Sequence, residues 1–429
     1  MTAISAERPL RQLLLTPPQW LLIGIVLIAS FVLTMLFWAV IPTGMGENES
    51  SDFLHFYAPV ARNILAGEGL VTNNGQLAVR YPPGYPILLA GIFGLSGLTS
   101  ISESTLLAAF TLLCMGLSGV FVLLLARTLW NPYPALFAAL VWISYPLALW
   151  STKQPNSEIP FTPVLYGAVL LLWSGLARRN LTWPLAIGTG LLLGFAMLIR
   201  PIALGAGVIL ALGLRFGTGY LPRSRRFILI GMLLLGNLLM ILPWQLWVYN
   251  QTGQVILLST GGAPSIRDGL TFAVNPKSYR EGVIVPEAVA VLSSNIMDRG
   301  SQIQSTSELL AVVATEGREQ PLALLQLIVL KAARSWYATD SQRFELPILI
   351  LQLLYLLPIL VATWTTWRMG GKWRNYTLMV WLLVGYFWGM TTLVLSIVRY
   401  MFPMMGLLFV LLPGLIMARR SRTHEPLRN

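Results

Sequence analysis

Long apolar runs separated by short polar links constrain this chain more than any other feature of its sequence. A helix of about 20 apolar residues crosses the hydrocarbon core of a bilayer, and a backbone in lipid must satisfy its hydrogen bonds internally. We therefore expect about ten transmembrane helices in an all-α polytopic membrane protein. They are predicted at Trp20–Ile41, Glu103–Ala126, Pro134–Trp150, Ile159–Gly175, Trp183–Ile199, Ile202–Phe216, Phe227–Tyr249, Leu346–Thr366, Thr377–Ile397 and Pro403–Ala418.

Composition supports this class. The chain is 55% hydrophobic and only 11% charged, against about 25% charged residues in soluble domains. Its net charge of +12 does not indicate a nucleic-acid partner, because the basic residues are scattered between apolar runs instead of forming one stripe. The first apolar run exceeds the core of about 7 to 15 residues found in cleaved signal peptides, so we expect a retained span. Cys114 is the single cysteine, which rules out an intrachain disulfide.

The distribution of charge predicts the orientation in the membrane. Two apolar stretches, Tyr85–Leu98 and Leu322–Leu330, are short for a crossing. If neither crosses, one side receives 16 of the 29 basic residues but only two of the 17 acidic ones. That side is cytoplasmic by the positive-inside bias, and both termini lie there. We expect the two short stretches to be helices in the outer interface.

This topology divides the chain into three parts. They are a transmembrane catalytic module at 1–249 with a first outer loop at 42–102, an outer segment at 250–345 with an interfacial helix at 321–337, and transmembrane helices with a basic cytoplasmic tail at 346–429. Residues 259–282 are rich in turn formers and are predicted to be irregular. The interfacial helix ends in Lys331, Arg334, Trp336 and Tyr337, groups typical of an interfacial anchor. We find no internal repeat and no boundary of a soluble domain.

Ionisable and aromatic side chains gather at the outer ends of the predicted spans and in the outer loops. Charges at membrane depth are costly, and each is therefore a hypothesis of function. The candidate site residues are Asp52, His55, Tyr57, Arg80, Tyr81, Lys153, Glu158, Arg200, Arg399 and Tyr400.

Structural interpretations compete with the functional ones in the first outer loop. Asp52 is a favoured residue for capping the helix expected from about Leu54. His55 suits packing or hydrogen bonding better than catalysis. With two histidines in the chain, a multi-histidine zinc site is implausible. Arg80 and Tyr81 could anchor the loop in the interface.

The remaining candidates also have alternatives. Lys153 and Glu158 could pair with each other or face water. Arg200 and Arg399 border outer span ends against the positive-inside bias, which favours a function, although long cations can snorkel to headgroup phosphates.

Several of these motifs also occur together in a known family. Asp52, then "FYAPVARNILAGEGL", "RYPPGYPILLAGIFGL", the acid opening the fourth span, "GFAMLIRP", "EQPLALLQLIVLKAARSWY" and "VRYMFP" follow in order over about 350 residues. In this order and spacing the chain resembles GT-C fold glycosyltransferases, specifically the family of protein O-mannosyltransferases and lipid A aminoarabinose transferases.

The resemblance implies a GT-C-like fold and an inverting transferase that moves a hexose or pentose from a polyprenyl-phosphate donor at the outer face of a bacterial plasma membrane. Asp52 matches the catalytic base and Glu158 the family's second acid, while the other candidates would bind substrate. Phe53 follows Asp52, which disfavours a metal held by two first-loop carboxylates. We expect no cofactor, although a divalent metal is possible. The expected partners are the donor lipid, a glycan, lipid or protein acceptor, and membrane lipids.

The chemistry of the residues agrees with this expectation. A carboxylate can take the proton of an acceptor hydroxyl, and arginines can stabilise the charge that accumulates on the departing phosphate. The main alternative is a transporter or flippase of lipid-linked sugars, but transporters tend to show internal repeats and midplane sites. A non-catalytic assembly or sensor protein with the same fold is a further alternative.

Overall fold

A computed structural model describes residues 17–41, 52–217, 219, 221–274 and 285–416. Within these ranges the chain consists almost entirely of helices, and the one β-interaction is an isolated antiparallel bridge between Val71 and Leu77. The predicted all-α class is confirmed. The predicted cytoplasmic tails and the start of the first outer loop lie outside the described residues.

Six helices within the described ranges are long and apolar enough to cross a membrane. They are α2 (Gln19–Val40), α5 (Glu103–Leu129), α8 (Glu158–Ala177), α11 (Arg223–Thr252), α17 (Glu345–Met369) and α18 (Gly371–Leu393). The other four predicted spans coincide with shorter helices, namely α6 (Pro132–Ile143) with α7 (Pro146–Ser151), α9 (Trp183–Ile199), the 3₁₀ turn η2 (Pro201–Ala203) with α10 (Ala206–Gly217), and α19 (Val398–Phe409). The number of helices that cross the membrane stays a prediction.

The predicted span at 134–150 and the start of the last predicted span differ from the structure, and proline accounts for the first difference. The segment 134–150 is not one helix, because Tyr145 is extended and Pro146 starts a new helix. Proline disfavours helical backbone at the preceding residue, so the chain bends there. The last helix begins at Val398 and not at Pro403. Arg399 therefore lies in its first turn.

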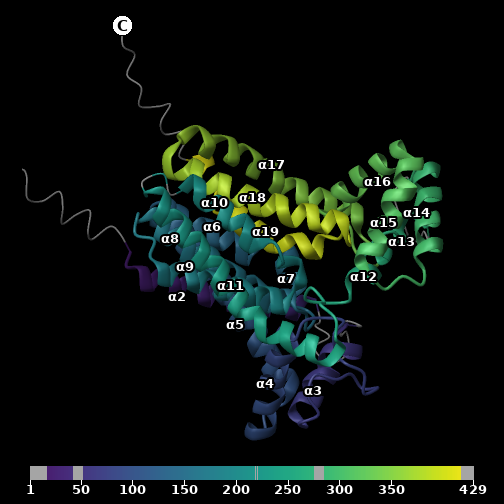
Figure 1. Cartoon of the computed structure of the whole chain (residues 1–429). Helices are drawn as coiled ribbons and strands as arrows, with labels where there is room; N and C mark the ends of the chain where they lie inside the picture. Colours follow the sequence, from purple (N-terminus) through teal and green to yellow (C-terminus); the bar gives the residue numbers. More distant parts are fainter. Residues whose placement is uncertain (1–16, 42–51, 218, 220, 275–284, 417–429) are drawn as a thin grey trace, which may run out of the picture.

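The helix α8 lies at the centre of the bundle, where it packs between α5 and α9 (Figure 1). It is the most buried of the six long helices, with 78% of its apolar window inside the protein, against 22% for α2 and α11. The peripheral helices instead expose large apolar side chains, as expected of helices that face lipid. The N-terminus of α8 is therefore enclosed by protein.

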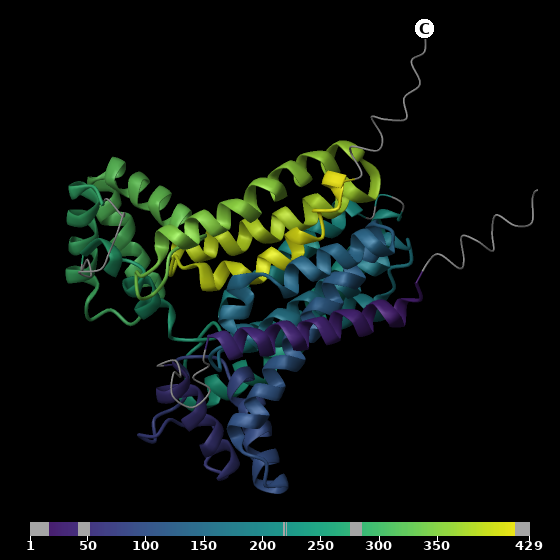
Figure 2. The same cartoon turned by 180° about the vertical axis from the view of Figure 1, so that it is seen from behind.

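The first outer loop forms a helical unit at one end of the bundle. It contains the π-helical turn η1 (Phe53–Tyr57), α3 (Ala58–Leu65) and α4 (Gly84–Thr99). In both views α4 runs at a steep angle to α2 and projects from the bundle (Figures 1 and 2). That direction is consistent with the interfacial position predicted for it, and the exposed face of α4 includes Ile87, Leu95 and Leu98.

The second outer segment has a hydrophobic core of its own. Its helices are α12 (Gly262–Asp268), α13 (Thr271–Val274), α14 (Glu287–Gly300), α15 (Thr306–Glu319) and α16 (Pro321–Arg334). Buried side chains that include Ile266, Leu292, Ile296, Leu309 and Leu327 pack together between them. The prediction of irregular structure at 259–282 is wrong for α12 and α13, because apolar residues among the turn formers join this core. Residues 275–284 lie outside the described residues.

The end of α16 also differs from the prediction. Lys331 and Arg334 were expected in the membrane interface, yet both side chains are buried. Arg334 forms a bidentate ion pair with Glu345 at 2.8 Å, and the two groups compensate each other inside the protein. These residues therefore join the outer segment to the membrane helices.

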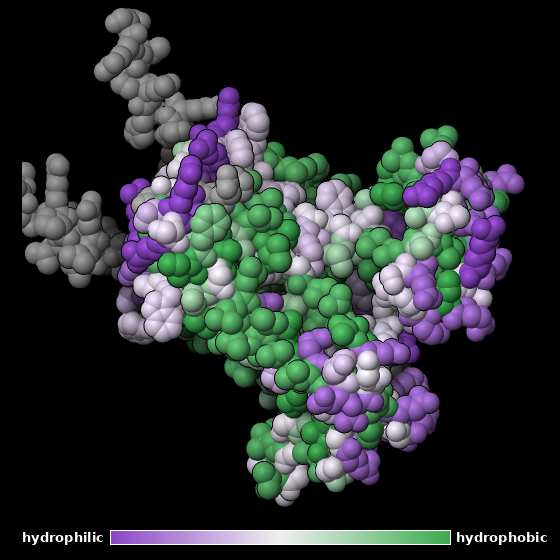
Figure 3. Space-filling model, viewed as in Figure 1, coloured by the Kyte–Doolittle hydropathy of each residue, from purple (hydrophilic) through white to green (hydrophobic). Residues whose placement is uncertain are grey.

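The surface separates these regions by polarity. Figure 3 shows a broad apolar area over the helical body, with hydrophilic residues at one end and two lobes of mixed polarity at the other, where α14–α16 and the first outer loop lie. An apolar surface between two polar ends suits a protein embedded in a bilayer.

Candidate functional site

Three charged residues from distant parts of the chain meet at the end of the bundle that carries the outer loops. Glu158 is the first residue of α8, Arg200 follows the last residue of α9, and Arg399 lies in the first turn of α19. Pro201 accounts for the position of Arg200, whose backbone is extended because a residue before proline avoids the helical region.

The carboxylate of Glu158 lies between the two guanidinium groups. Its Oε1 atom is 2.5 Å from Arg200 Nη1 and 2.7 Å from Arg399 Nε. Both contacts are ion pairs, although their angles leave Glu158 Oε1 and Arg399 Nε without a hydrogen bond of good geometry. The Glu158 side chain is 1% exposed and that of Arg200 is 10% exposed. A buried acid is thus held in place by two permanent positive charges.

An aromatic ring and a hydroxyl complete this cluster. The Arg200 guanidinium carbon lies 4.6 Å from the centre of the Tyr400 ring, and that of Arg399 lies 5.7 Å from it. Arg200 Nη1 also donates a hydrogen bond to Ser157 Oγ at 3.0 Å. Both guanidinium groups thus lie near the same aromatic ring, and Ser157 holds one nitrogen of Arg200.

Arg399 remains partly accessible. Its side chain is 31% exposed, and its Nη1 atom lies 3.8 Å from Asp340 Oδ2 in the link between α16 and α17. The Asp340 side chain is 56% exposed, so water weakens its effect on Arg399. Glu158, Arg200 and Arg399 together carry one more positive than negative charge, and Arg399 is the accessible member of the three.

The first outer loop brings Asp52 next to Tyr81. The Tyr81 hydroxyl donates a hydrogen bond to Asp52 Oδ1 at 3.1 Å. Asp52 has helical backbone and its side chain makes no capping hydrogen bond, so the structure gives no support to the N-cap interpretation. Tyr81 packs edge-on against Phe56 at 5.1 Å and lies 5.2 Å from the Tyr57 ring.

Tyr57 links the two groups of charges. Burial raises the pKa of its phenol well above the ordinary value, with further raising from Tyr81, Asp52 and Glu158 and lowering from Arg200. Asp52, Glu158 and Arg200 therefore all lie within electrostatic range of this one ring. The charges of both acids of the predicted site thus influence the phenol of Tyr57.

Close packing at Gly84 fixes the first outer loop against α9. A Cβ atom at Gly84 would lie 2.6 Å from the backbone carbon and oxygen of Leu198, two residues before Arg200. Only glycine permits this approach of the two backbones. The "YPPGYP" motif thus sets the position of Tyr81 relative to Arg200.

Three candidates lie outside this arrangement or at its edge. His55 is exposed and makes no hydrogen bond or ion pair within the described residues. The Lys153 amine lies 4.6 Å from the Trp150 ring, and Glu158 pairs with arginines, so a Lys153–Glu158 pair is not formed. Arg80 is exposed and lies over the Tyr81 ring at 5.5 Å.

The charged and polar pair Arg62 and Asn63, within the stretch "FYAPVARNILAGEGL" of the first outer loop, has a structural explanation. Arg62 forms a bidentate ion pair with Glu103 at the start of α5, at 2.8 and 2.9 Å. Asn63 donates to the carbonyl of Val71 at 2.9 Å. These contacts tie α3 to its surroundings and do not reach the Glu158 cluster.

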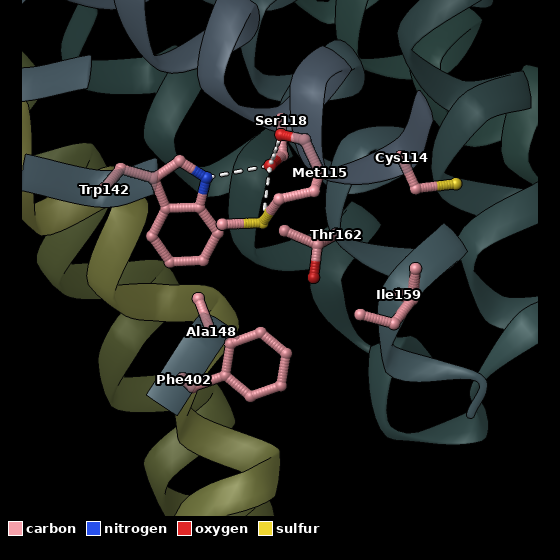
Figure 4. A pocket seen from close by; sticks show the side chains of 8 residues that line it. All are labelled: Cys114, Met115, Ser118, Trp142, Ala148, Ile159, Thr162 and Phe402. Carbon is pink, nitrogen blue, oxygen red and sulfur yellow. Dashed lines mark hydrogen bonds between the residues drawn. The ribbon is translucent and has the colours of Figure 1, made fainter. Parts of the chain in front are cut away.

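A small pocket lies within the bundle, beside the first turn of α8 (Figure 4). Its walls include Ile159, Thr162, Ser118 and Phe402, and most of its lining is apolar. The two hydroxyls already donate to backbone carbonyls, Thr162 to that of Glu158. The pocket therefore offers no free polar group to a charged ligand, and the Glu158 cluster is the better candidate for one.

No group of three or more potential metal ligands occurs among the residues that the structure describes. Sequence reasoning also missed Asp340 and Ser157, which contact the two arginines. The one signal for Ser157 was its position beside Glu158, and nothing in the sequence pointed to Asp340.

Comparisons with known proteins agree with this architecture. Residues 80–249 match the family of dolichyl-phosphate-mannose-protein mannosyltransferases. No curated protein matches the sequence. The crystal structure of ArnT from Cupriavidus metallidurans bound to undecaprenyl phosphate is similar, with a TM-score of 0.54 and 16% identity over 94% of this chain and 61% of ArnT.

The oligosaccharyltransferase AglB from Archaeoglobus fulgidus is similar as well. Its complex with an inhibitory peptide and a dolichol-phosphate has a TM-score of 0.54 and 15% identity over 96% of this chain. The apo form gives a TM-score of 0.56 at 14% identity. The chain spans 61% of the length of ArnT and 52% of that of the oligosaccharyltransferase.

The described residues thus have the GT-C fold, which defines a class of membrane glycosyltransferases. Within that class, residues 80–249 match the mannosyltransferase family named above, and the resemblance predicted from the motifs is confirmed. At this level of identity the structural likeness establishes the fold, and the chemistry has to be argued from the site.

Proposed function

We propose that this protein transfers a hexose or pentose from a polyprenyl-phosphate donor to a hydroxyl of a glycan, lipid or protein acceptor. One observation carries the proposal. On a GT-C fold, the buried Arg200–Glu158–Arg399 cluster and the Asp52–Tyr81 hydrogen bond are joined by the close packing of Gly84 in the first outer loop against Leu198, two residues before Arg200. Cations that can hold a phosphate and a carboxylate that can accept a proton thereby lie at the same end of the bundle.

The arginine cluster suits the phosphate of the donor. Two guanidinium groups around one carboxylate leave a positive charge for an anion, and Arg399 is accessible to it. As the bond between the sugar C1 and the phosphate oxygen breaks, negative charge grows on the phosphate. Fixed cations in a site of low dielectric constant stabilise that charge. ArnT was crystallised with undecaprenyl phosphate, which supports a ligand of this chemical class.

Asp52 supplies the second requirement. The acceptor oxygen attacks the sugar C1 from the side opposite the phosphate, its proton passes to an Asp52 oxygen, and polyprenyl phosphate leaves. A single displacement inverts the configuration at C1. Tyr81 occupies Oδ1 of Asp52, which leaves Oδ2 for the acceptor hydroxyl. The phosphate is a stable leaving group, so no general acid is needed.

The charge distribution supports an outward-facing site. The cluster lies at the end of the bundle that carries the outer loops, whereas the basic groups around Arg178, Arg223 and Arg368 lie at the opposite ends of their helices. By the positive-inside bias those groups face the cytoplasm. We place the site at the outer face of a bacterial plasma membrane, with both termini inside.

The test is a transfer assay with the full-length protein in sealed, right-side-out membrane vesicles. Sugar-labelled polyprenyl phosphates are placed in the bilayer, and impermeant envelope glycolipid or glycan acceptors are added outside. Label on the external acceptor, with release of polyprenyl phosphate, is expected. Movement of the intact labelled lipid across the bilayer without cleavage would instead identify a flippase. Transfer only to acceptors trapped inside would contradict the outward site.

A further inference from the structure

Lys331 is a buried cation next to the helix end that precedes Arg399. Lys331 is 5% exposed, and it forms no ion pair with any residue that the structure describes. Its amine donates to the backbone carbonyls of Leu393 at 3.2 Å and Val394 at 3.1 Å, at the C-terminal end of α18. Carbonyls at a helix end have no partner within the helix, and a cation there satisfies them.

The carbonyls that Lys331 binds open the short link from α18 to α19. Val394 has non-helical backbone, and helix α19 starts again at Val398. The amide of Val398 donates to the Ala338 carbonyl at 2.9 Å, so this link runs beside the one between α16 and α17. Arg399 is the next residue. Its place opposite Glu158 thus depends on where the link begins.

The outer segment packs closely against the same carbonyl group of Val394. A Cβ atom at Gly269, just after α12, would lie 2.0 Å from the Val394 carbonyl oxygen and 3.1 Å from the Lys331 amine. Glycine is therefore needed where α12 meets the end of α18. Trp388 of α18 donates to the Ala332 carbonyl at 2.8 Å, which holds α16 and α18 together beside this contact. These contacts leave little space for α12 or α16 to shift relative to the end of α18.

We infer that Lys331 is a positioning residue for donor binding, because it fixes the α18–α19 link that presents Arg399 to the phosphate. This inference rests on the proposed function. Lys331 touches neither the donor nor the reacting atoms in this account. Its effect is exerted through Arg399, and that dependence separates positioning from a general contribution to stability.

The experiment measures binding of undecaprenyl phosphate and the donor Michaelis constant for the full-length protein in lipid nanodiscs. Lys331→Met should weaken the binding of undecaprenyl phosphate and raise the donor Michaelis constant, each by about tenfold or more. This change is comparable to the loss of one hydrogen bond to a charged group. Lys331→Arg should restore most of the loss. In an Arg399→Ala background, Lys331→Met should have almost no further effect.

Lys372→Met is the matched control. Lys372 lies in the first turn of α18 and, like Lys331, donates to a backbone carbonyl, that of Thr128 at 2.9 Å. It lies at the end of α18 opposite to the one that Lys331 of α16 contacts. It should leave donor binding unchanged. If Lys331→Met does not fold, Lys331→Gln, which retains a neutral donor, is measured in its place.

The outcomes separate the two proposals. A loss caused by Lys331→Met that is equally large with and without Arg399 would overturn the inference, as would an unchanged donor constant. Donor binding that depends on Arg399 but not on Lys331 overturns the inference alone. A parent protein that neither transfers sugar nor binds undecaprenyl phosphate overturns the proposed function and the inference with it.

Discussion

The hydroxyl of Tyr81 donates a hydrogen bond to Asp52 and joins two parts of the first outer loop that lie 29 residues apart. Burial, followed by the nearby Asp52 carboxylate, raises the pKa of the Tyr81 phenol well above its ordinary value. Tyr81 therefore stays protonated and remains a donor across the physiological range. One oxygen of Asp52 is fixed, and the orientation of the other follows from it.

Replacing Tyr81 by Phe should lower the rate of transfer by about 10 to 100-fold, because hydrogen bonds to charged groups contribute about 1.5–3 kcal/mol. Donor binding should not change, since the arginine cluster is left intact. Tyr85→Phe is the control, as Tyr85 packs in the same aromatic group but is not bonded to Asp52. A Tyr81→Phe protein with the parent's turnover would show that Asp52 needs no such orientation.

Glu158→Gln should destabilise the fold strongly. Removing the only buried carboxylate of the cluster leaves two arginine charges facing each other, and breaking a buried ion pair costs about 3–5 kcal/mol. Glu103→Gln breaks the exposed pair with Arg62 and should cost about 1 kcal/mol or less. Unfolding by denaturant in detergent measures both. Equal costs would mean that the Glu158 pairs contribute no more than a surface contact.

Arg399 should tolerate no substitution without a loss of donor affinity. Lys retains the charge but loses the planar group that can contact Glu158 and a phosphate together, so Arg399→Lys should raise the donor Michaelis constant and Arg399→Ala should nearly abolish use of the donor. The same series applies to Arg200. An arginine that only reaches lipid headgroups would accept Lys without change.

Lys331 should give the protein a stability that depends on pH. Burial lowers its pKa to about 7 from the ordinary value of 10.5. Between these values the unfolded chain binds more protons than the folded protein, so the stability contributed by this residue increases from about pH 7 to about pH 10.5. The melting temperature of the parent protein should therefore rise relative to that of the Lys331→Met protein over this interval. Parallel curves for the two proteins would contradict the lowered pKa.

The sequence predicted the helices better than the contacts between them. Apolar runs locate helices because burial in lipid needs a continuous stretch, and each predicted span coincides with one helix or with two consecutive helical segments. The break at Tyr145 could have been read from Pro146. The short helices in 259–282 could not, because the apolar residues that form them only become a core when α14 and α16 pack against them.

The sequence singled out the charged residues of the candidate site but did not predict which of them form ion pairs. Arg200 and Arg399 were singled out because charges at span ends are costly, and the structure brings them together. Their shared partner is Glu158, which the sequence had placed beside Lys153 as the nearest cation in the chain. Nearness in sequence misleads here, because the N-terminus of α8 is enclosed by α9 and α19. Asp340 carries no local signal in the sequence, and Lys331 was expected to be an interfacial anchor, whereas it is buried against the end of α18.

The transfer rate of the Asp52→Asn protein tests the central claim most directly. Asn has nearly the same shape and can still accept the Tyr81 hydrogen bond, but it cannot take a proton. With donor binding and unfolding measured in parallel and unchanged, transfer should fall by about 10² to 10⁴-fold, as expected on losing a general base. A mutant that retains most of the parent's turnover would contradict the assignment of Asp52 as the base and with it the proposed mechanism.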